Sequence, residues 1–126
     1  PLQYLNGVLH KRCICFLLSD FQLSIPETTL RIVAKKHDVI GIQILDPLEI
    51  QLKKVGLIHL IDSESGARIS FDTSDIEWLR SHEQTQREHQ LKTKSSFVRS
   101  KADFLAIDIR YSYISTLLQF FKRRSK

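Results

Sequence analysis

Polar side chains that could bind a cation or move a proton follow two apolar segments of this chain. Ser19 and Asp20 come directly after the apolar run 14–18, and Asp46 follows a second apolar run at 39–45. Oxygen ligands of this kind are the ones that Mg²⁺ prefers. Paired carboxylates can also act as general acid and general base.

A short apolar run such as 14–18 is typical of a strand buried on both faces of a parallel sheet. In open α/β sheets, ligands bind just beyond the carboxyl ends of the strands. The polar residues after the two runs should therefore share one edge of the sheet. The predicted site at this edge, which we call the strand-end rim, consists of Ser19, Asp20, Asp46 and Glu49.

A structural role is the alternative for these side chains. Asp20 could accept hydrogen bonds from backbone N–H groups of its own loop, and Asp46 could initiate a turn with Pro47. The sequence leaves both interpretations open for Asp20. It favours the structural one for Asp46 and Glu49.

The elements that must position the rim form a βαβ unit. We expect strands at 13–19 and 39–45, with a helix between them that begins at Pro26 and Glu27. Proline suits the first helical position, and glutamate favours the positive end of the helix dipole. The buried stripe of this helix should comprise Leu30, Val33 and Ala34.

Four further elements follow from local patterns. The spacing of apolar residues at 2–9 predicts the last turns of a helix. Strands at 57–61 and 67–71 should form a hairpin around the turn 62–66. A third buried strand is expected at 103–109.

Two helices complete the prediction. Ser74 and Glu77 form a capping box, which starts a helix that is polar from 80 to 90. We expect this helix to be largely solvent-exposed, mobile beyond residue 90, and interrupted at Ser95-Ser96. Ser112 should cap a last helix with a broad apolar face.

The two cysteines, Cys13 and Cys15, lie on one face of the first strand. Their separation along a strand makes a mutual disulfide unfavourable. A Cys-x-Cys pair without a second Cys or His pair nearby in the sequence is a poor zinc signal. We therefore expect two buried core residues in a reducing compartment.

The composition is that of an ordinary soluble globular domain or part of one, with 126 residues, 42% of them hydrophobic and 26% charged. No apolar run is long enough to span a bilayer, and no signal peptide is present. The chain begins with Pro1 and contains no methionine. We therefore interpret it as a fragment with an expected cytoplasmic location, and the membrane attachment of the parent protein stays open.

Much of the net charge of +5 is carried by a basic tail. The tail comprises Lys122, Arg123, Arg124 and Lys126. It could contact nucleic acid or anionic lipid. The interpretation we favour is a solvated helix end whose positive charge complements the helix dipole.

The order of several short motifs resembles a known bacterial family. These motifs are Leu17-Leu18-Ser19-Asp20-Phe21, Lys36-His37-Asp38-Val39-Ile40, Asp46-Pro47-Leu48-Glu49, Gly56, Asp62-Ser63-Glu64-Ser65-Gly66, Asp72-Thr73, Asp103-Phe104 and the segment 117–123. They resemble the C-terminal half of the family catalogued as domain of unknown function 58. That family resembles von Willebrand factor A domains, and its genes often neighbour those of MoxR-type AAA+ ATPases.

The resemblance implies an α/β fold: a Rossmann-like, von Willebrand A-like three-layer sheet, here partial and with an added β-hairpin. Residues 1–126 would form the C-terminal portion of a single such domain. In these domains a divalent metal is bound by an Asp-x-Ser-x-Ser motif, a Thr and an Asp that ends the fourth strand. Asp20 matches that last Asp.

This chain departs from the metal-binding pattern in two ways. Asp-x-Ser-x-Ser is absent, and Phe21 stands where the pattern usually has Gly. We therefore expect no cofactor in this fragment. Asp20 is predicted as a metal ligand, for Mg²⁺, only in a full-length parent.

The function implied by the resemblance is protein interaction, as adaptor or chaperone partner of a MoxR-type AAA+ ATPase, and not catalysis. The expected contact surface is the strand-end rim, with the polar helix at 75–92 as a second candidate. A fragment of such a sheet exposes an edge, which predicts a homodimer through the first strand. No small-molecule substrate is evident.

Two alternative functions stay open. The basic tail would serve a nucleic-acid-binding domain, although the interleaved aromatic residues of such domains are missing, so nucleic acid is not the favoured partner. A metal-dependent hydrolase that uses Asp20 in the full-length protein is the second alternative.

Overall fold

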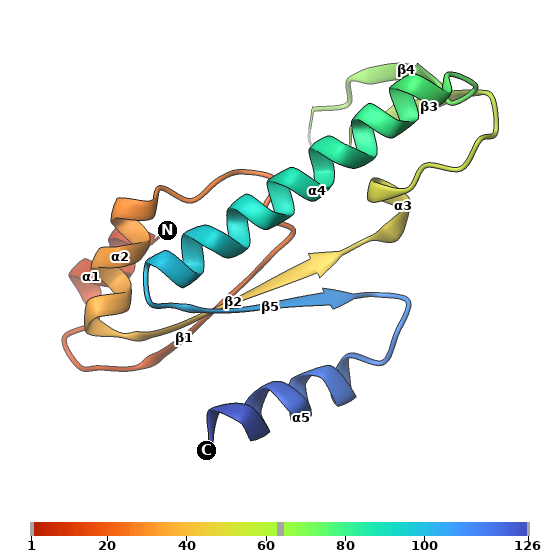
Figure 1. Cartoon of the computed structure of the whole chain (residues 1–126). Coiled ribbons are helices and arrows are strands. Elements are labelled where there is room, and N and C mark those ends of the chain that lie inside the picture. Colours follow the sequence, from red (N-terminus) through yellow and green to blue (C-terminus); the bar gives the residue numbers. More distant parts are fainter. Residues whose placement is uncertain (1, 63–64, 126) are drawn as a thin grey trace.

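The computed structural model describes residues 2–62 and 65–125, apart from the side chains at positions 3, 5, 6 and 49. Figure 1 shows the order of the elements along the chain. They are α1 (Leu2–Val8), β1 (Ile14–Ser19), α2 (Glu27–Lys36), β2 (Asp38–Leu45), α3 (Pro47–Ile50), β3 (Leu57–Ile61), β4 (Arg68–Asp72), α4 (Ile76–Arg99), β5 (Asp103–Asp108) and α5 (Tyr113–Arg124).

The centre of the fold is a sheet of three parallel strands in the order β1-β2-β5. The expected strand–helix–strand unit is present as β1, α2 and β2. Helices α1, α2 and α4 lie on one side of the sheet, and α5 lies on the other (Figure 1). The chain is therefore a mixed α/β structure, as the sequence predicted.

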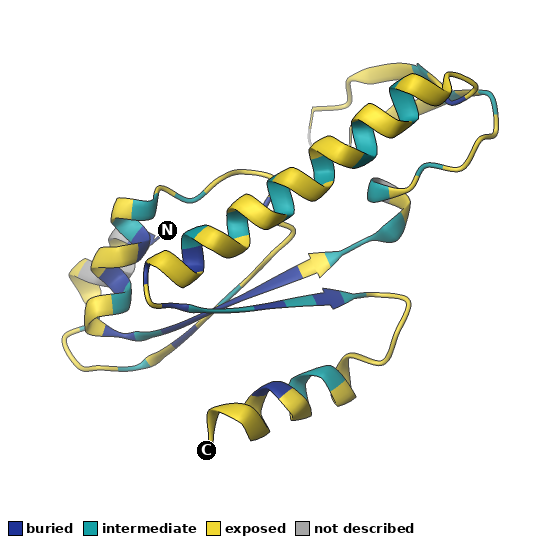
Figure 2. Ribbon diagram, in the orientation of Figure 1, coloured by how far each residue is buried: buried dark blue, intermediate teal, exposed yellow. Residues whose placement is uncertain are grey.

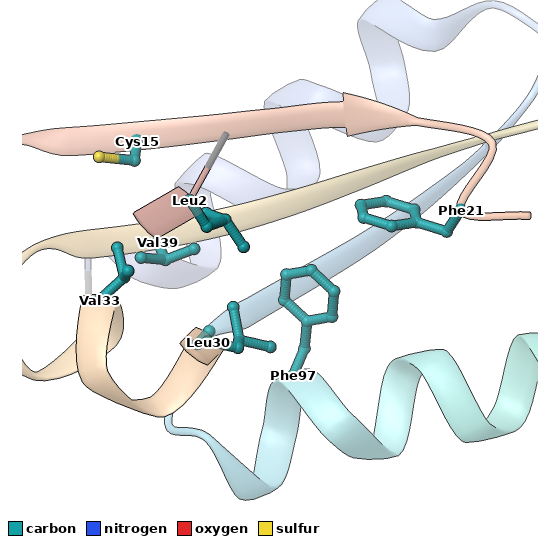
Figure 3. Packing of buried hydrophobic residues seen from close by; sticks show 8 residues of the cluster. Leu2, Cys15, Phe21, Leu30, Val33, Val39 and Phe97 are labelled. Atoms are coloured by element: carbon teal, nitrogen blue, oxygen red, sulfur yellow. The ribbon is translucent and has the colours of Figure 1, made fainter. Parts of the chain in front are cut away.

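Two hydrophobic clusters hold these layers together. The cluster on the α2 side includes Leu30 and Val33 of α2 and Phe97 of α4, all of them buried as Figure 3 shows. The smaller cluster lies under α5. Its buried members are Ile40, Ile42, Leu105, Ile107 and Phe120.

The first strand is not buried on both faces, which corrects the prediction. Cys15 is buried, but Ile14, Phe16 and Leu18 are 60%, 46% and 65% exposed. The reason is the strand order, because β1 is an edge strand and α5 packs under the other two strands. The strand covered on both faces is β2, with residues 39–43 all buried.

The last helix, α5, buries fewer of its apolar side chains than the sequence suggested. Phe120 is buried, whereas Tyr113, Ile114 and Leu118 of α5 are each more than half exposed. Ser112 occupies the N-cap position but forms no capping hydrogen bond through its side chain. The broad apolar face of α5 therefore continues onto the surface next to the exposed face of β1, where Phe16 contacts Phe121.

Helix α4 is continuous through Ser95-Ser96, so the predicted interruption is wrong. Phe97 in the last turn is only 1% exposed, so this end of α4 packs in the core. The predicted mobility beyond residue 90 stays a prediction. The expected exposure of the polar part is confirmed (Figure 2). The cap differs by one residue: the Asp75 side chain accepts hydrogen bonds from the backbone N–H groups of Glu77 and Trp78.

The predicted hairpin is confirmed as the antiparallel pair β3 and β4, which forms a separate two-stranded sheet. Its contact with α4 is aromatic: Phe71 packs on Trp78 with 5.0 Å between ring centroids. Ser63 and Glu64, in the predicted turn, lie outside the described residues.

Within the described part of the chain, no helix combines the length and the apolar character that crossing a bilayer requires.

Candidate functional site

The carboxyl ends of the three parallel strands meet at one edge of the sheet, as the strand-end rim requires. Ser19 ends β1 and pairs with Gln43 of β2, and Leu45 at the end of β2 pairs with Asp108 at the end of β5. Asp46 follows Leu45 directly. This is the edge at which open α/β sheets bind their ligands.

Ser19 and Asp20 form a short polar turn at the end of β1. The Oδ1 atom of Asp20 accepts hydrogen bonds from the backbone N–H of Gln22 at 3.2 Å and from the Ser19 hydroxyl at 3.3 Å. The Ser19 Oγ accepts from the backbone N–H of Phe21 at 3.0 Å. Both side chains are nevertheless exposed. Asp20 therefore has the structural role that we considered, and its carboxylate is also accessible to a partner or an ion.

Phe21 fixes this turn in the core. Its φ of 56° lies in the left-handed region that a bulky residue rarely adopts. Its ring is 3% exposed and packs edge-on against Phe97 at 5.4 Å. Burial of the ring offsets the backbone strain, so Phe21 anchors the turn that carries Asp20.

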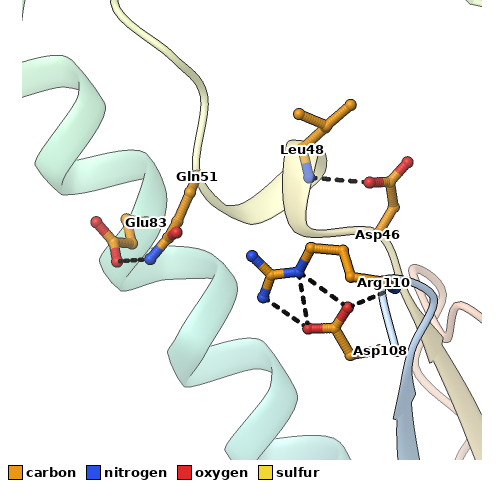
Figure 4. Close-up of polar contacts among 6 residues, drawn as sticks. All are labelled: Asp46, Leu48, Gln51, Glu83, Asp108 and Arg110. Carbon is orange, nitrogen blue, oxygen red and sulfur yellow. Dashed lines mark hydrogen bonds and ion pairs between the residues drawn. The ribbon is translucent and has the colours of Figure 1, made fainter. Parts of the chain in front are cut away.

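Asp46 has the structural role that the sequence favoured. Its Oδ1 accepts a hydrogen bond from the backbone N–H of Leu48 at 2.9 Å and so caps α3 (Figure 4). Glu49 belongs to α3, but its side chain lies outside the described part of the structure. The carboxylate of Asp46 is half-buried and still reaches the surface of the rim.

A narrow polar cleft brings Asp20 and Asp46 together. It encloses about 20 Å³ and is lined in addition by Gln22, Gln43, Ile44, Leu45, Ile50, Gln86, His89 and Gln90. Room of this size suits about one water molecule, whereas sites for small-molecule ligands usually enclose 300–1,000 Å³. This cleft alone is therefore too small to enclose a small-molecule ligand.

Gln43 is a residue of this cleft that the sequence analysis missed. It is 4% exposed, its Nε2 donates to the backbone carbonyl of Asp20 at 3.0 Å, and its Oε1 is buried without a partner among the described residues. Gln43 is the one polar side chain in the apolar run 39–45, and this could have identified it from the sequence. Through this hydrogen bond, β2 holds the loop that carries Asp20.

The third strand contributes an ion pair that was also missed. Arg110 contacts Asp108 through Nη2 at 2.7 Å and through Nε at 3.1 and 3.2 Å (Figure 4). These bonds, and one from the backbone N–H of Arg110, lower the pKa of Asp108. Asp108 could have been identified from the sequence, because it lies at the end of a strand, as Asp20 and Asp46 do.

The rim carboxylates do not converge on one point. Across the described residues, the potential metal-ligand groups within 4.8 Å of one another comprise Cys13, Cys15 and His37, and none of the rim. The role of Asp20 as a metal ligand in a longer parent stays a prediction.

The basic tail is partly neutralised. Arg124 contacts Asp38 at 2.6 Å and Asp103 at 3.0 Å, which ties the end of α5 to the sheet. Lys126 lies outside the described residues. Less free positive charge is therefore available for nucleic acid than the sequence suggested.

Comparison with known proteins identifies relatives by sequence. The family model described as "Protein of unknown function DUF58" matches residues 1–92. An uncharacterized protein of Mycobacterium avium is 25% identical over 117 residues, which cover 92% of this chain and 69% of the relative. Uncharacterized proteins of Mycobacterium bovis and Mycobacterium tuberculosis are each 39% identical over 57 residues, 44% of this chain and only 18% of their own length. No solved structure matches the chain.

Proposed function

Because the chain belongs to the family described as protein of unknown function DUF58, we propose that it is a protein-interaction module with a von Willebrand A-like, Rossmann-like fold. Its partner is a MoxR-type AAA+ ATPase, for which it acts as adaptor or co-chaperone. The parallel sheet with helices on both sides supports the fold. The gene neighbourhood of the resembling family supports the partner.

The observation that carries this proposal is the exposed strand-end rim. Ser19 and Asp20 are exposed, and Asp46 joins Asp20 in a cleft of about 20 Å³. A carboxylate edge with so little enclosed volume favours contact with a protein over conversion of a small molecule. The proposal therefore assigns this chain binding and no reaction.

The rim is negatively charged, so its partner surface should be cationic. Asp20 and Asp46 place carboxylates at the ends of neighbouring strands, whereas the charge of Asp108 is balanced by its ion pair with Arg110. Complementary charge mainly raises the association rate and determines which partner binds. Binding through the rim should therefore weaken as the salt concentration rises.

The test is a binding measurement between the chain and the MoxR-type ATPase of the same organism, by interferometry at two salt concentrations. The variant Asp20→Asn/Asp46→Asn removes both charges and keeps an oxygen acceptor at each position. We expect it to bind about tenfold more weakly, as for loss of an interface hot spot. Unchanged affinity would overturn the assignment of the rim.

A second variant distinguishes the two candidate surfaces. Gln84→Ala/Glu88→Ala removes an exposed hydrogen-bonded pair in the middle of α4 and leaves the rim intact. If this variant alone loses affinity, the polar helix is the contact surface and the rim is not. If neither the unmodified chain nor either variant binds the ATPase at low salt, the proposed partner is wrong.

A further inference from the structure

Two cysteines and a histidine meet at the edge of the sheet opposite the strand-end rim. Cys13 precedes β1 and Cys15 lies within it, and their Sγ atoms are 3.4 Å apart. His37 lies between α2 and β2, with its Nδ1 3.4 Å from the Sγ of Cys13. The atoms that these three residues offer to an ion all lie within 4.8 Å of one another.

The backbone fixes this cluster. Alternate residues of a strand point to the same face, so Cys13 and Cys15 both face α2. Ile14 pairs with Asp38, and the backbone N–H of Asp38 donates to the carbonyl of Cys13 at 2.8 Å. His37 therefore stands beside Cys13 at the first rung of the parallel ladder. The three side chains are brought together by elements that define the fold.

The imidazole of His37 is buried beside the two thiols. His37 is 3% exposed, and its Nε2 forms no hydrogen bond with the described residues. Cys15 is 8% exposed, and Cys13 is half-buried. The other ring nitrogen, Nδ1, faces the Sγ of Cys13 at 3.4 Å, so this nitrogen and the two thiol sulfur atoms are the groups that could bind one ion.

A surface hollow leads to this cluster. His37 lines it together with His10, Arg12 and Lys36. Neither cysteine lines the hollow, so an ion or a water molecule in it would meet the cluster at His37. It lies at the start of β1, whereas the rim lies at the end of the same strand, so the two sites are separate.

We propose that Cys13, Cys15 and His37 bind a Zn²⁺ ion, with the fourth coordination position open to water from the hollow. Thiolate and imidazole are the ligands that Zn²⁺ takes in proteins, at about 2.3 Å and 2.0 Å. Tetrahedral geometry with these bond lengths separates two sulfur atoms by about 3.8 Å, and sulfur from nitrogen by about 3.5 Å. The two observed separations of 3.4 Å lie close to these values, and the ligand atoms of Cys15 and His37 lie within 4.8 Å of each other.

Binding of Zn²⁺ displaces the protons of the two thiols. Each thiol forms a bond to Zn²⁺ and releases its proton to solvent, and the neutral imidazole donates a lone pair. No oxidant or reductant takes part. This site is independent of the proposed interaction with an ATPase.

The first experiment uses the whole chain, reduced and stripped of metal with a chelator, and titrates it with Co²⁺. Cobalt occupies zinc sites and gives a thiolate-to-metal charge-transfer absorption. We expect one Co²⁺ per chain with this absorption, and its loss when Zn²⁺ is added. Zn²⁺ should also raise the melting temperature, because it binds the native state. A folded, reduced chain without thiolate-to-cobalt absorption would overturn the proposal.

Variants identify the ligands. Cys13→Ser and His37→Gln should each weaken Zn²⁺ binding by at least about 100-fold, since loss of groups that merely support a ligand already costs 10–100-fold. His59→Gln, in the distant hairpin, should bind as the parent chain does. Circular dichroism without metal establishes that each variant is folded. If a folded Cys13→Ser chain binds Zn²⁺ as tightly as the parent, the site is not the one proposed.

Discussion

The ring of Phe97 lies directly against the Cα of Gly41. A Cβ atom at position 41 would come within 2.4 Å of Cε1 and 2.6 Å of Cζ of that ring. The contact joins the last turn of α4 to the central strand. It explains why an apolar residue that follows a long polar stretch of helix is among the most buried in the chain.

Gly41→Ala should therefore destabilise the protein. The added methyl group must displace a ring held between α2 and the sheet, and overpacking of this kind costs about 1–3 kcal/mol in unfolding free energy. Gly7→Ala is the matched control, because nothing lies within 4 Å of a Cβ there and the site is helical. It should be neutral or slightly stabilising. Denaturant unfolding followed by circular dichroism measures both. Equal stability of the two variants would contradict the packing described.

The start of α4 depends on Asp75 rather than on the capping box predicted at Ser74. Asp75 Oδ1 accepts hydrogen bonds from two backbone N–H groups, at 3.0 and 3.1 Å. Asp75→Ala should lower the unfolding free energy by about 1 kcal/mol. Ser74→Ala should have little effect. If Ser74→Ala costs as much as Asp75→Ala in the same unfolding measurement, the capping residue is Ser74.

Local signals were sufficient to predict most elements. The βαβ unit follows from two apolar runs and from the Pro26-Glu27 helix start, and the hairpin follows from a turn between two apolar arms. The cap was misplaced because Ser74 and Asp75 are both good N-cap residues. Choosing between them depends on the entry direction of the chain, which Asp72 fixes by accepting a hydrogen bond from the N–H of Ser74.

Properties that depend on distant parts of the chain could not be predicted. The prediction that the first strand is buried on both faces was wrong, because burial depends on the strand order and this order places β1 at an edge. Cys13, Cys15 and His37 meet only through the pairing of β1 with β2, so the cysteine spacing alone gave a poor metal signal. The rim residues Asp20 and Asp46 were identifiable because each directly follows an apolar run.

Arg124 should stabilise the fold, because its ion pairs with Asp38 and Asp103 attach the end of α5 to the sheet and form what we call the Arg124 clamp. Its guanidinium contacts both carboxylate oxygens of Asp38 at 2.6 and 2.7 Å, and these side chains are 27% and 31% exposed. We expect Arg124→Ala to lower the unfolding free energy by about 1 kcal/mol, at the upper end for partly exposed pairs. Arg123→Ala is the neighbouring control. The difference should shrink at high salt, and identical stability of the two variants would show that the clamp contributes nothing.

The exposed face of β1 should drive self-association. Phe16, Leu18 and Leu23 line an apolar groove beside this edge strand, and an unpaired edge with apolar side chains favours pairing with a second copy. Sedimentation should show a concentration-dependent dimer. Leu18→Lys should weaken it, whereas Ile32→Lys, at a half-exposed site on α2, should not. A clean monomer at high protein concentration would exclude pairing through β1.

Burial raises the pKa of the Cys15 thiol to about 11, with further contributions from the neighbouring Cys13 thiol and from the charge of Asp38. In an unfolded chain a thiol has a pKa of about 8.5. As pH rises between these two values, the unfolded state loses this proton before the folded state does. The contribution of Cys15 to stability is therefore complete below about pH 8.5 and is lost as pH approaches 11.

The unfolding free energy of the metal-free, reduced chain should consequently fall with pH more steeply than that of Cys15→Ala. The other titrating groups are present in both proteins, so the difference reports the loss of Cys15 together with the loss of its contact with Cys13. An extra loss of about 3 kcal/mol is expected over the window. Denaturant unfolding in the presence of a chelator, at several pH values, measures it. Parallel pH profiles for the two proteins would mean that the thiol titrates at its ordinary pKa and that β1 opens to solvent at Cys15.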